Sequence, residues 1–284
     1  MQDDTSGRAP DPSGPSAPDA APETDTPPKI NTDVPHSARI WNYWLGGTDN
    51  YEVDRIAGDR YVAVYPAIRD LARGGRYFLA RAIRYLVTEA GVRQFLDIGT
   101  GLPTVDNTHE VAQRHAPECR IVYVDNDPLV LAHARALLTS TPEGSTTYID
   151  ADLHHPETIL EQARSSLDFS RPIGLMLMGV MGHIVDDGTA HDVVRRLVDA
   201  LPSGSYLTMY DATDTDPDFN KAQSGYDDTG AVPYVLRDAD FVRGYFAGLE
   251  PVDPGIVPLS RWRPEVEPIK DLDDPTLCGV ARKP

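Results

Sequence analysis

The sequence is poor in the features that mark secreted, membrane and metal-binding proteins. Its two cysteines, Cys119 and Cys278, are too few for a disulfide framework, which favours reduced thiols. No run reaches the roughly eighteen apolar residues that span a bilayer. The N-terminus contains Asp3 and Asp4 and no apolar signal-peptide segment. We therefore expect a cytoplasmic protein with no membrane partner.

Positive charge and metal-ligand clusters are also scarce. The chain has 26 Lys and Arg residues against 44 Asp and Glu residues, a formal net charge of −18. Nucleic-acid binding relies on clustered basic side chains, so we expect no nucleic-acid partner and favour a small-molecule substrate. His154 and His155 are adjacent, lack a companion cysteine and are interpreted as loop residues, so no metal is predicted. No pattern indicates an oligomeric state.

Three segments differ in composition. Residues 1–35 contain eight prolines, seven acidic and two basic residues and no aromatic residue, which cannot bury enough apolar surface to fold. We predict a disordered tail over residues 1–34, an aromatic loop with a helical cap over residues 35–90, and an α/β core over residues 91–284. Within the cap we expect helices near residues 54–64 and 76–89, separated by Pro66 and by Gly74 and Gly75. Arg76, Arg81 and Arg84 are expected on a solvated surface or, alternatively, in an anionic acceptor site.

The stretch QFLDIGTG, residues 94–101, predicts a buried parallel strand that ends in a glycine turn. Such a turn lets a ligand approach the backbone closely and aims the amides of the next helix at it. Asp97, Gly99, Thr100 and Gly101 are therefore candidate ligand contacts. We expect a helix from Thr104 after the turn, and Asn107 near its start either contacts ligand or forms hydrogen bonds at the helix start.

A second strand is predicted in RIVYVDND, residues 120–127. An acidic residue at the tip of the second strand of an α/β unit can accept hydrogen bonds from a ribose diol, and Asp125 has that position. Asn126 follows it, and Asp127 precedes Pro128 as the expected N-cap of a helix. A dinucleotide fingerprint would have a third glycine where Thr104 stands, which disfavours a nicotinamide enzyme.

Residues 35–55 are unusually aromatic and surround the pair Gly46 and Gly47. One interpretation is a short helix that pins the N-terminus to the core. The other is a loop that closes over a ligand, with aromatic rings excluding water. In the second interpretation Gly46, Gly47 and Asn50 form the closing loop, and Arg39 and Asp54 supply charge.

Several motifs together carry a family resemblance. The pattern AR-x-W-N-Y-W-LGG-TDNY-x-x-DR, then FLDIGTGLPT, VYVDNDP and YIDADL, resembles the actinobacterial S-adenosylmethionine-dependent methyltransferase family formerly catalogued as a domain of unknown function. The similarity covers residues 35–283. It implies a Rossmann-like fold with S-adenosylmethionine at the glycine turn. It also implies that Asp152 and Leu153 contact the adenine, and that Arg39, Tyr43, Gly47 and Asn50 cover the cofactor.

The fold class expected is α/β, with a seven-stranded, mostly parallel sheet, helices on both faces, a C-terminal antiparallel hairpin and an N-terminal helical cap. A fourth strand ends at Met178, where a methyl acceptor would meet the cofactor, and His183 follows it. His183 is a candidate general base or a pocket-wall residue, and Tyr43 is a second catalytic candidate. Tyr210 and Asp211, at the end of the fifth strand, are candidate acceptor contacts.

The predicted function is methyl transfer by direct displacement to an unidentified acceptor. Holding the acceptor in line with the methyl group is the main contribution, so no residue need attack. Two alternatives stay open: an NAD-dependent oxidoreductase, and a non-catalytic protein that binds S-adenosylmethionine or S-adenosylhomocysteine.

Overall fold

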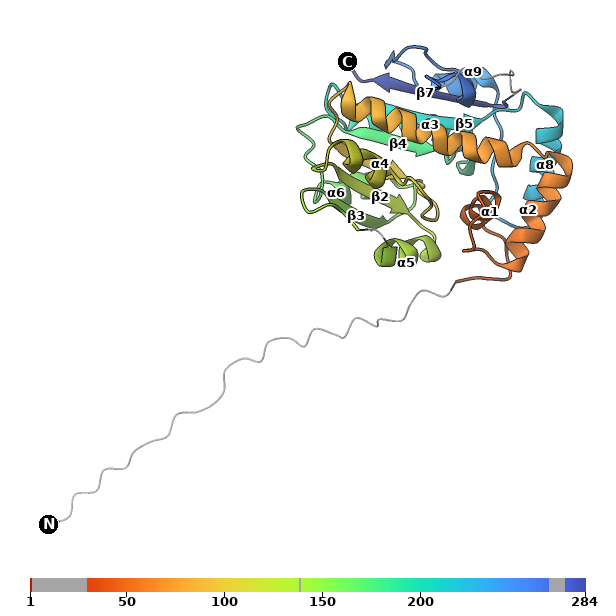
Figure 1. Cartoon of the computed structure of the whole chain (residues 1–284), viewed down its shortest axis with the longest axis horizontal. Helices are drawn as coiled ribbons and strands as arrows, with labels where there is room; N and C mark the ends of the chain where they lie inside the picture. Colours follow the sequence, from red (N-terminus) through yellow and green to blue (C-terminus); the bar gives the residue numbers. More distant parts are fainter. Residues whose placement is uncertain (2–29, 138, 266–273) are drawn as a thin grey trace.

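The computed structural model describes residue 1, residues 30–137, residues 139–265 and residues 274–284 (Figure 1). Most of the predicted disordered tail falls on residues 2–29, outside the described residues. Residues 30–34 are described, and Asn31 and Val34 each accept a hydrogen bond from Arg39. None of the helices in the described ranges is long and apolar enough to cross a membrane.

A seven-stranded sheet forms the centre of the molecule, with strand order β3-β2-β1-β4-β5-β7-β6. The first five strands run parallel to their neighbours, whereas β7 is antiparallel to β5 and to β6. The predicted fold class is therefore confirmed. The strands are β1 (Gln94–Ile98), β2 (Arg120–Asp125), β3 (Ser145–Asp150), β4 (Gly174–Met178), β5 (Tyr206–Ala212), β6 (Glu250–Pro251) and β7 (Thr276–Arg282).

Helices cover both faces of this sheet, which explains why β1 and β5 are buried along their whole length. Alternate residues of a strand point to opposite faces. Phe95 and Ile121 pack in the same cluster as α3 (Ile68–Thr88) and α4 (Thr108–His115), which lie over one face in Figure 1. Leu96 and Val122 pack on the other face with α6 (Pro156–Ala163), α7 (Asp187–Asp199) and α9 (Ala239–Gly244).

The parallel register brings the carboxyl ends of the strands together. Ile98 at the end of β1 lies opposite Val124 of β2 and Leu177 of β4. The chain order reverses between β1 and β4, and ligands of open α/β sheets bind in the crevice at such a point. A turn of 3-10 helix, η1 (Met181–His183), follows β4 there.

Two predicted helix boundaries were wrong. The second helix of the cap begins at Ile68 and runs through Gly74 and Gly75. A Cβ at Gly75 would lie 2.9 Å from the Tyr210 hydroxyl, so glycine permits close packing there. The helix after the glycine turn begins only at Thr108, because Asn107 is its N-cap and forms a capping box with Glu110.

The N-terminal cap consists of α1 (Ser37–Trp44) and α2 (Glu52–Val64), which pack against α3 and α8 (Pro217–Asp227). Its aromatic residues form a chain of edge-to-face contacts. Trp44 and Tyr61 have ring centroids 5.1 Å apart, and Tyr61 and Phe219 6.0 Å. Such contacts pin the N-terminal segment to the rest of the fold. Helix α5 (Pro128–Leu137) follows β2 in the chain and contacts β3.

Candidate active site

A cavity of about 370 Å³ lies at the carboxyl ends of the parallel strands, within the range typical of ligand pockets. Ten residues predicted from the sequence line it: Asp97, Gly99, Thr100, Gly101, Asp125, Asn126, Asp152, Leu153, Met178 and His183. The α1 segment lines the opposite side with His36, Ser37, Ala38, Trp41, Asn42 and Leu45. The cavity therefore lies between the sheet and the cap.

The glycine turn at the end of β1 requires its glycines. Gly99 and Gly101 have φ angles of +72° and +64°, which side chains rarely adopt. A Cβ at Gly99 would lie 2.4 Å from Cγ2 of Val180, so the turn also packs tightly against the β4 tip. A Cβ at Gly101 would meet only Ala38, at 4.0 Å. The backbone of Gly101 is thus open to an approaching ligand.

Asp125 holds this turn in place from the end of β2. Its carboxylate accepts hydrogen bonds from the backbone N–H of Gly101 and of Asp127, both at 2.9 Å. Burial raises the pKa of Asp125. Asp127 accepts from the Leu129 N–H at 2.8 Å, which is the predicted N-cap role. A carboxylate has further lone pairs, so Asp125 can also accept from a ligand hydroxyl.

Two charged side chains of opposite sign lie beside the turn. Burial raises the pKa of Asp97 to about 6, and its Oδ2 accepts a hydrogen bond from Thr108 at 2.6 Å. Arg76, on α3, lines the same cavity and donates to the backbone oxygen of Asp106 at 2.7 Å. Its Nε is buried and has no hydrogen-bond partner among the described residues. Such an atom is a candidate donor to a ligand.

The three arginines for which the sequence left a solvated surface or an anionic acceptor site open have different environments in the structure. Arg76 is in the cavity wall. Arg81 donates to the backbone oxygens of Trp262 and Leu259, at 2.9 and 2.8 Å. Only Arg84, which pairs with the exposed Glu265, fits the solvated interpretation. Sequence reasoning assigned Arg76 to a site only as the alternative to a solvated surface.

His183 reaches the cavity from η1. Its Nδ1 lies 2.9 Å from the backbone oxygen of Pro233. A carbonyl oxygen only accepts, so Nδ1 carries the proton and Nε2 has a free lone pair. Burial lowers the pKa of His183, which favours the neutral ring near pH 7. Tyr210, at the β5 tip, also lines the cavity, as predicted for an acceptor contact, whereas Asp211 does not line it and is bonded to Tyr234.

The cap contributes different residues from those predicted. Among the described residues, the cavity lining does not include Arg39, Tyr43, Gly47 or Asn50. Helical periodicity explains the difference on α1, because residues 38, 41, 42 and 45 share one face of a helix and residues 39 and 43 point elsewhere. The Tyr43 hydroxyl donates to Asp59 at 2.7 Å, and this hydrogen bond raises the pKa of Tyr43.

Asn50 and Gly47 contact Asn42, a residue of the cavity lining. The Asn50 amide donates to the Asn42 side chain and to the Gly47 backbone oxygen, both at 2.9 Å. A Cβ at Gly47 would lie 2.3 Å from the Asn42 amide nitrogen, so Gly47 leaves room for that side chain. Both residues thus position Asn42, which lines the cavity. Asn107 caps α4 and donates to the Thr104 backbone oxygen at 2.6 Å.

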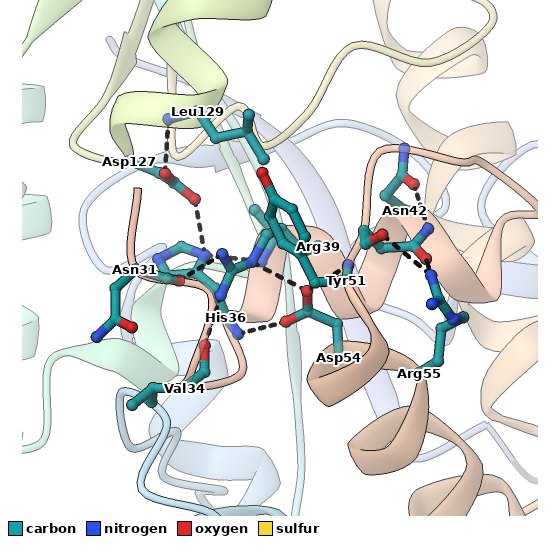
Figure 2. A network of polar contacts seen from close by, with 12 residues as sticks. Asn31, Val34, His36, Arg39, Asn42, Tyr51, Asp54, Arg55, Asp127 and Leu129 are labelled. Carbon is teal, nitrogen blue, oxygen red and sulfur yellow. Dashed lines mark hydrogen bonds and ion pairs between the residues drawn. The ribbon is translucent and has the colours of Figure 1, made fainter. Parts of the chain in front are cut away.

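Arg39 is the centre of a buried network that holds the cap together (Figure 2). Its Nε lies 3.2 Å from Oδ2 of Asp54, and its other nitrogens donate to the backbone oxygens of Asn31 and Val34, at 2.8 and 2.6 Å. Asp54 also accepts from the backbone N–H of His36, at 2.9 Å. This network joins the start of α1 to α2.

His36 connects the same network to the core. Its Nδ1 lies 3.1 Å from Oδ2 of Asp127, at the N-terminus of α5 (Figure 2). The contact bridges the cap and the second strand tip. It fixes the edge of the cavity next to Asp125.

Comparison with known proteins identifies the family. A family model described as S-adenosyl methyltransferase matches residues 23–284. The chain belongs to this methyltransferase family. A DUF574 family protein from Streptomyces avermitilis is 43% identical over 90% of this chain and 100% of its own, with a TM-score of 0.86. A Thermobifida fusca protein described as a candidate methyltransferase is 38% identical over 92% of this chain and 99% of its own, with a TM-score of 0.83. No curated protein sequence matches significantly.

The methyltransferase family match confirms the resemblance seen in the sequence. This protein is an S-adenosylmethionine-dependent methyltransferase with a Rossmann-like fold, and both relatives come from actinobacteria. The nicotinamide alternative is set aside by this result.

Proposed function

We propose that this methyltransferase binds its cofactor in the 370 Å³ cavity, with each part of S-adenosylmethionine at a different strand tip. Asp125 accepts from the ribose diol, and Asn126 lies beside it. Asp152 and Leu153 contact the adenine at the end of β3. Gly99, Thr100 and Gly101 present their backbone to the amino-acid part. The observation that carries this assignment is that these residues line one continuous cavity.

The charged pair beside the glycine turn suits the amino-acid end of the cofactor. That end carries an ammonium and a carboxylate. Asp97 supplies a negative charge when ionised, and Arg76 supplies a positive charge with a buried, unpartnered Nε among the described residues. We assign the cofactor carboxylate to Arg76 and its ammonium to Asp97, because an unpaired buried charge is costly.

The cap takes the covering role that the sequence assigned to other residues. Trp41, Asn42 and Leu45 line the cavity opposite the glycine turn and exclude water from the ligand. Arg39 and Asn50 support this wall from behind through the contacts of Asp54 and Asn42. We therefore propose positioning roles, rather than cofactor contacts, for Arg39, Gly47 and Asn50.

When bound, the cofactor supplies an activated methyl group on a sulfonium. The cavity wall would hold an acceptor O–H or N–H group in line with the activated methyl group that the bound cofactor would supply. His183 Nε2 takes the acceptor proton, since its neutral ring has a free lone pair there. Holding the acceptor in line contributes about 7–11 kcal/mol in well-oriented reactions.

We further propose that the acceptor is a small molecule and that the enzyme acts in the cytoplasm. The cap forms one wall of the cavity, which limits the room for a folded macromolecular substrate beside the cofactor. The excess of acidic residues is also unfavourable for a polyanionic acceptor.

Calorimetry tests the cofactor assignment. The protein is titrated with S-adenosylmethionine, S-adenosylhomocysteine and NADH. Asp125→Ala is expected to weaken binding of the first two by about 1–3 kcal/mol, as for lost hydrogen bonds to a charged group. Asp150→Ala is the matched control, since Asp150 pairs with Asp125 in the sheet register but is exposed and outside the cavity lining. Equal affinities of the two variants, or preferential binding of NADH, would refute the assignment.

A further inference from the structure

A second, smaller cavity of about 50 Å³ adjoins the cofactor cavity. The two share four lining residues, Ser37, Trp41, His183 and Tyr210. The remaining wall of the second cavity comes from α1, α2, α3, α8, β5, β7 and the segment before α9. A group that enters it must therefore lie next to the place where His183 faces the cofactor.

The wall of the second cavity is apolar and aromatic, and none of its residues is Asp, Glu, Lys or Arg. Besides the shared residues it consists of Ile40, Trp44, Tyr61, Ile68, Leu71, Ala212, Phe219, Gln223, Tyr226, Tyr234 and Thr276. Three of its hydroxyls are already used. Tyr226 donates to the Val232 backbone oxygen at 3.0 Å, Tyr61 to Gln223 at 3.4 Å, and Tyr234 to Asp211.

The other polar groups of this wall are also engaged. The Gln223 amide donates to Asp227 and to the Tyr234 backbone oxygen, at 3.1 and 3.0 Å. The shared wall also contains the Tyr210 hydroxyl, Nε2 of His183 and Nε1 of Trp41, for which no hydrogen bond is found among the described residues. Polar contacts are thus available at the junction, and ring and alkyl surface lies beyond it.

We propose that the second cavity binds a compact, uncharged alkyl group of the methyl acceptor. The atom that receives the methyl group then lies at the junction, beside His183 and Tyr210. The inference rests on the proposed cofactor site, because that site places the methyl group at the shared wall. An ionised group in this cavity would lose its hydration without a charged partner, which is costly.

Cavity size limits the group further. An engineered cavity of about 150 Å³ accommodates benzene, so a cavity of 50 Å³ takes only a few non-hydrogen atoms. A branched alkyl group of three or four carbons is the expected occupant. An aromatic ring of the acceptor would stay at the junction or in the larger cavity.

The test uses three probes of one shape and different charge. 2-Propanol, isopropylammonium and acetate each have four non-hydrogen atoms in a branched arrangement. Each is titrated into the protein, with and without S-adenosylhomocysteine, while tryptophan fluorescence reports on Trp41 and Trp44 in the wall. We expect 2-propanol to bind at least about 10-fold more tightly than either ion, which equals a difference of about 1.4 kcal/mol.

Two variants locate the binding. Ala212 lines the second cavity but not the first, so Ala212→Val fills space there and should weaken 2-propanol at least about 5-fold. Leu71→Ala enlarges the same cavity and should improve binding of the larger tert-butanol relative to 2-propanol. S-Adenosylhomocysteine affinity should stay within about two-fold in both variants, and a thermal melt confirms that they fold.

Failure of the inference about the second cavity and failure of the cofactor assignment give different results. Equal or tighter binding of an ion, or 2-propanol binding that neither variant changes, would overturn the inference about the second cavity. Loss of S-adenosylhomocysteine binding by the wild-type protein would instead overturn the cofactor assignment. The titrations without that ligand still measure occupancy of the second cavity.

Discussion

The buried pair formed by Arg39 and Asp54 offers a direct test of how the cap is held. The Arg39 side chain is 4% exposed and the Asp54 side chain is fully buried. Asp54 also accepts backbone hydrogen bonds from His36 and Tyr51, both at 2.9 Å. The change Asp54→Ala removes these acceptors together and leaves the guanidinium of Arg39 without its counter-charge.

The expected cost follows from burial. Removing one partner of a buried ion pair costs about 3–5 kcal/mol, because the remaining charge is unpaired. Arg39 keeps its bonds to the backbone oxygens of Asn31 and Val34, which places the expected loss near the lower end, at about 3 kcal/mol. Since α1 lines the cofactor cavity, affinity for S-adenosylhomocysteine should fall by up to about 100-fold.

Urea unfolding and calorimetry measure the two effects. Asp59→Ala is the matched control on α2, because Asp59 is exposed and its pair with Arg69 should contribute less than about 1 kcal/mol. The double variant Arg39→Met, Asp54→Ala should recover part of the lost free energy of unfolding, because it also removes the unpaired positive charge of Arg39. If Asp54→Ala behaved like Asp59→Ala in both assays, the proposed role of the buried pair would be wrong.

Two further predictions concern titrating groups. His183→Gln should reduce the rate of methyl transfer by about 10²–10⁴-fold and leave the affinity for S-adenosylhomocysteine unchanged. The wild-type rate should fall at acid pH with a pKa below the usual histidine value. An undiminished rate of the variant would exclude proton transfer by His183. For Asp97, the pKa of about 6 in the folded protein exceeds the usual value of about 3.9. The folded state therefore holds the proton more tightly, so the free energy of unfolding should fall as pH rises from about 4 to 6. Asp97→Asn should flatten this fall in urea titrations, and Asp211, whose pKa is also about 6, should contribute to the remainder together with Asp125 and Asp274, whose pKa values burial also raises; an unchanged slope would contradict the assignment.

The strand-tip half of the site could be predicted because its geometry is local. Parallel strands bring their carboxyl ends to one edge, so Asp97, Gly101, Asp125 and Asp152 had to approach one another once three strands were recognised. The glycine turn needed no tertiary information, since positive φ angles at Gly99 and Gly101 follow from a sharp turn between strand and helix.

The cap half required information that the sequence interpretation did not use. Arg39 was taken as a ligand contact because it is charged, yet its charge is matched inside the cap by Asp54. The helical repeat of Ala38, Trp41, Asn42 and Leu45 would have identified the face that lines the cavity. Gly75 was read as a helix break, but it is a close-packing position, which only the approach of Tyr210 shows.

Helix α1 has a larger part in this enzyme than its length suggests. A helix of eight residues is not stable alone in water, so its order must come from tertiary contacts such as the pair of Arg39 and Asp54. Its residues Ser37 and Trp41 belong to the walls of both cavities. A ligand in either cavity therefore stabilises a wall of the other. We therefore expect the binding of cofactor and acceptor to be coupled through the ordering of this short helix, in addition to their contact at the methyl group.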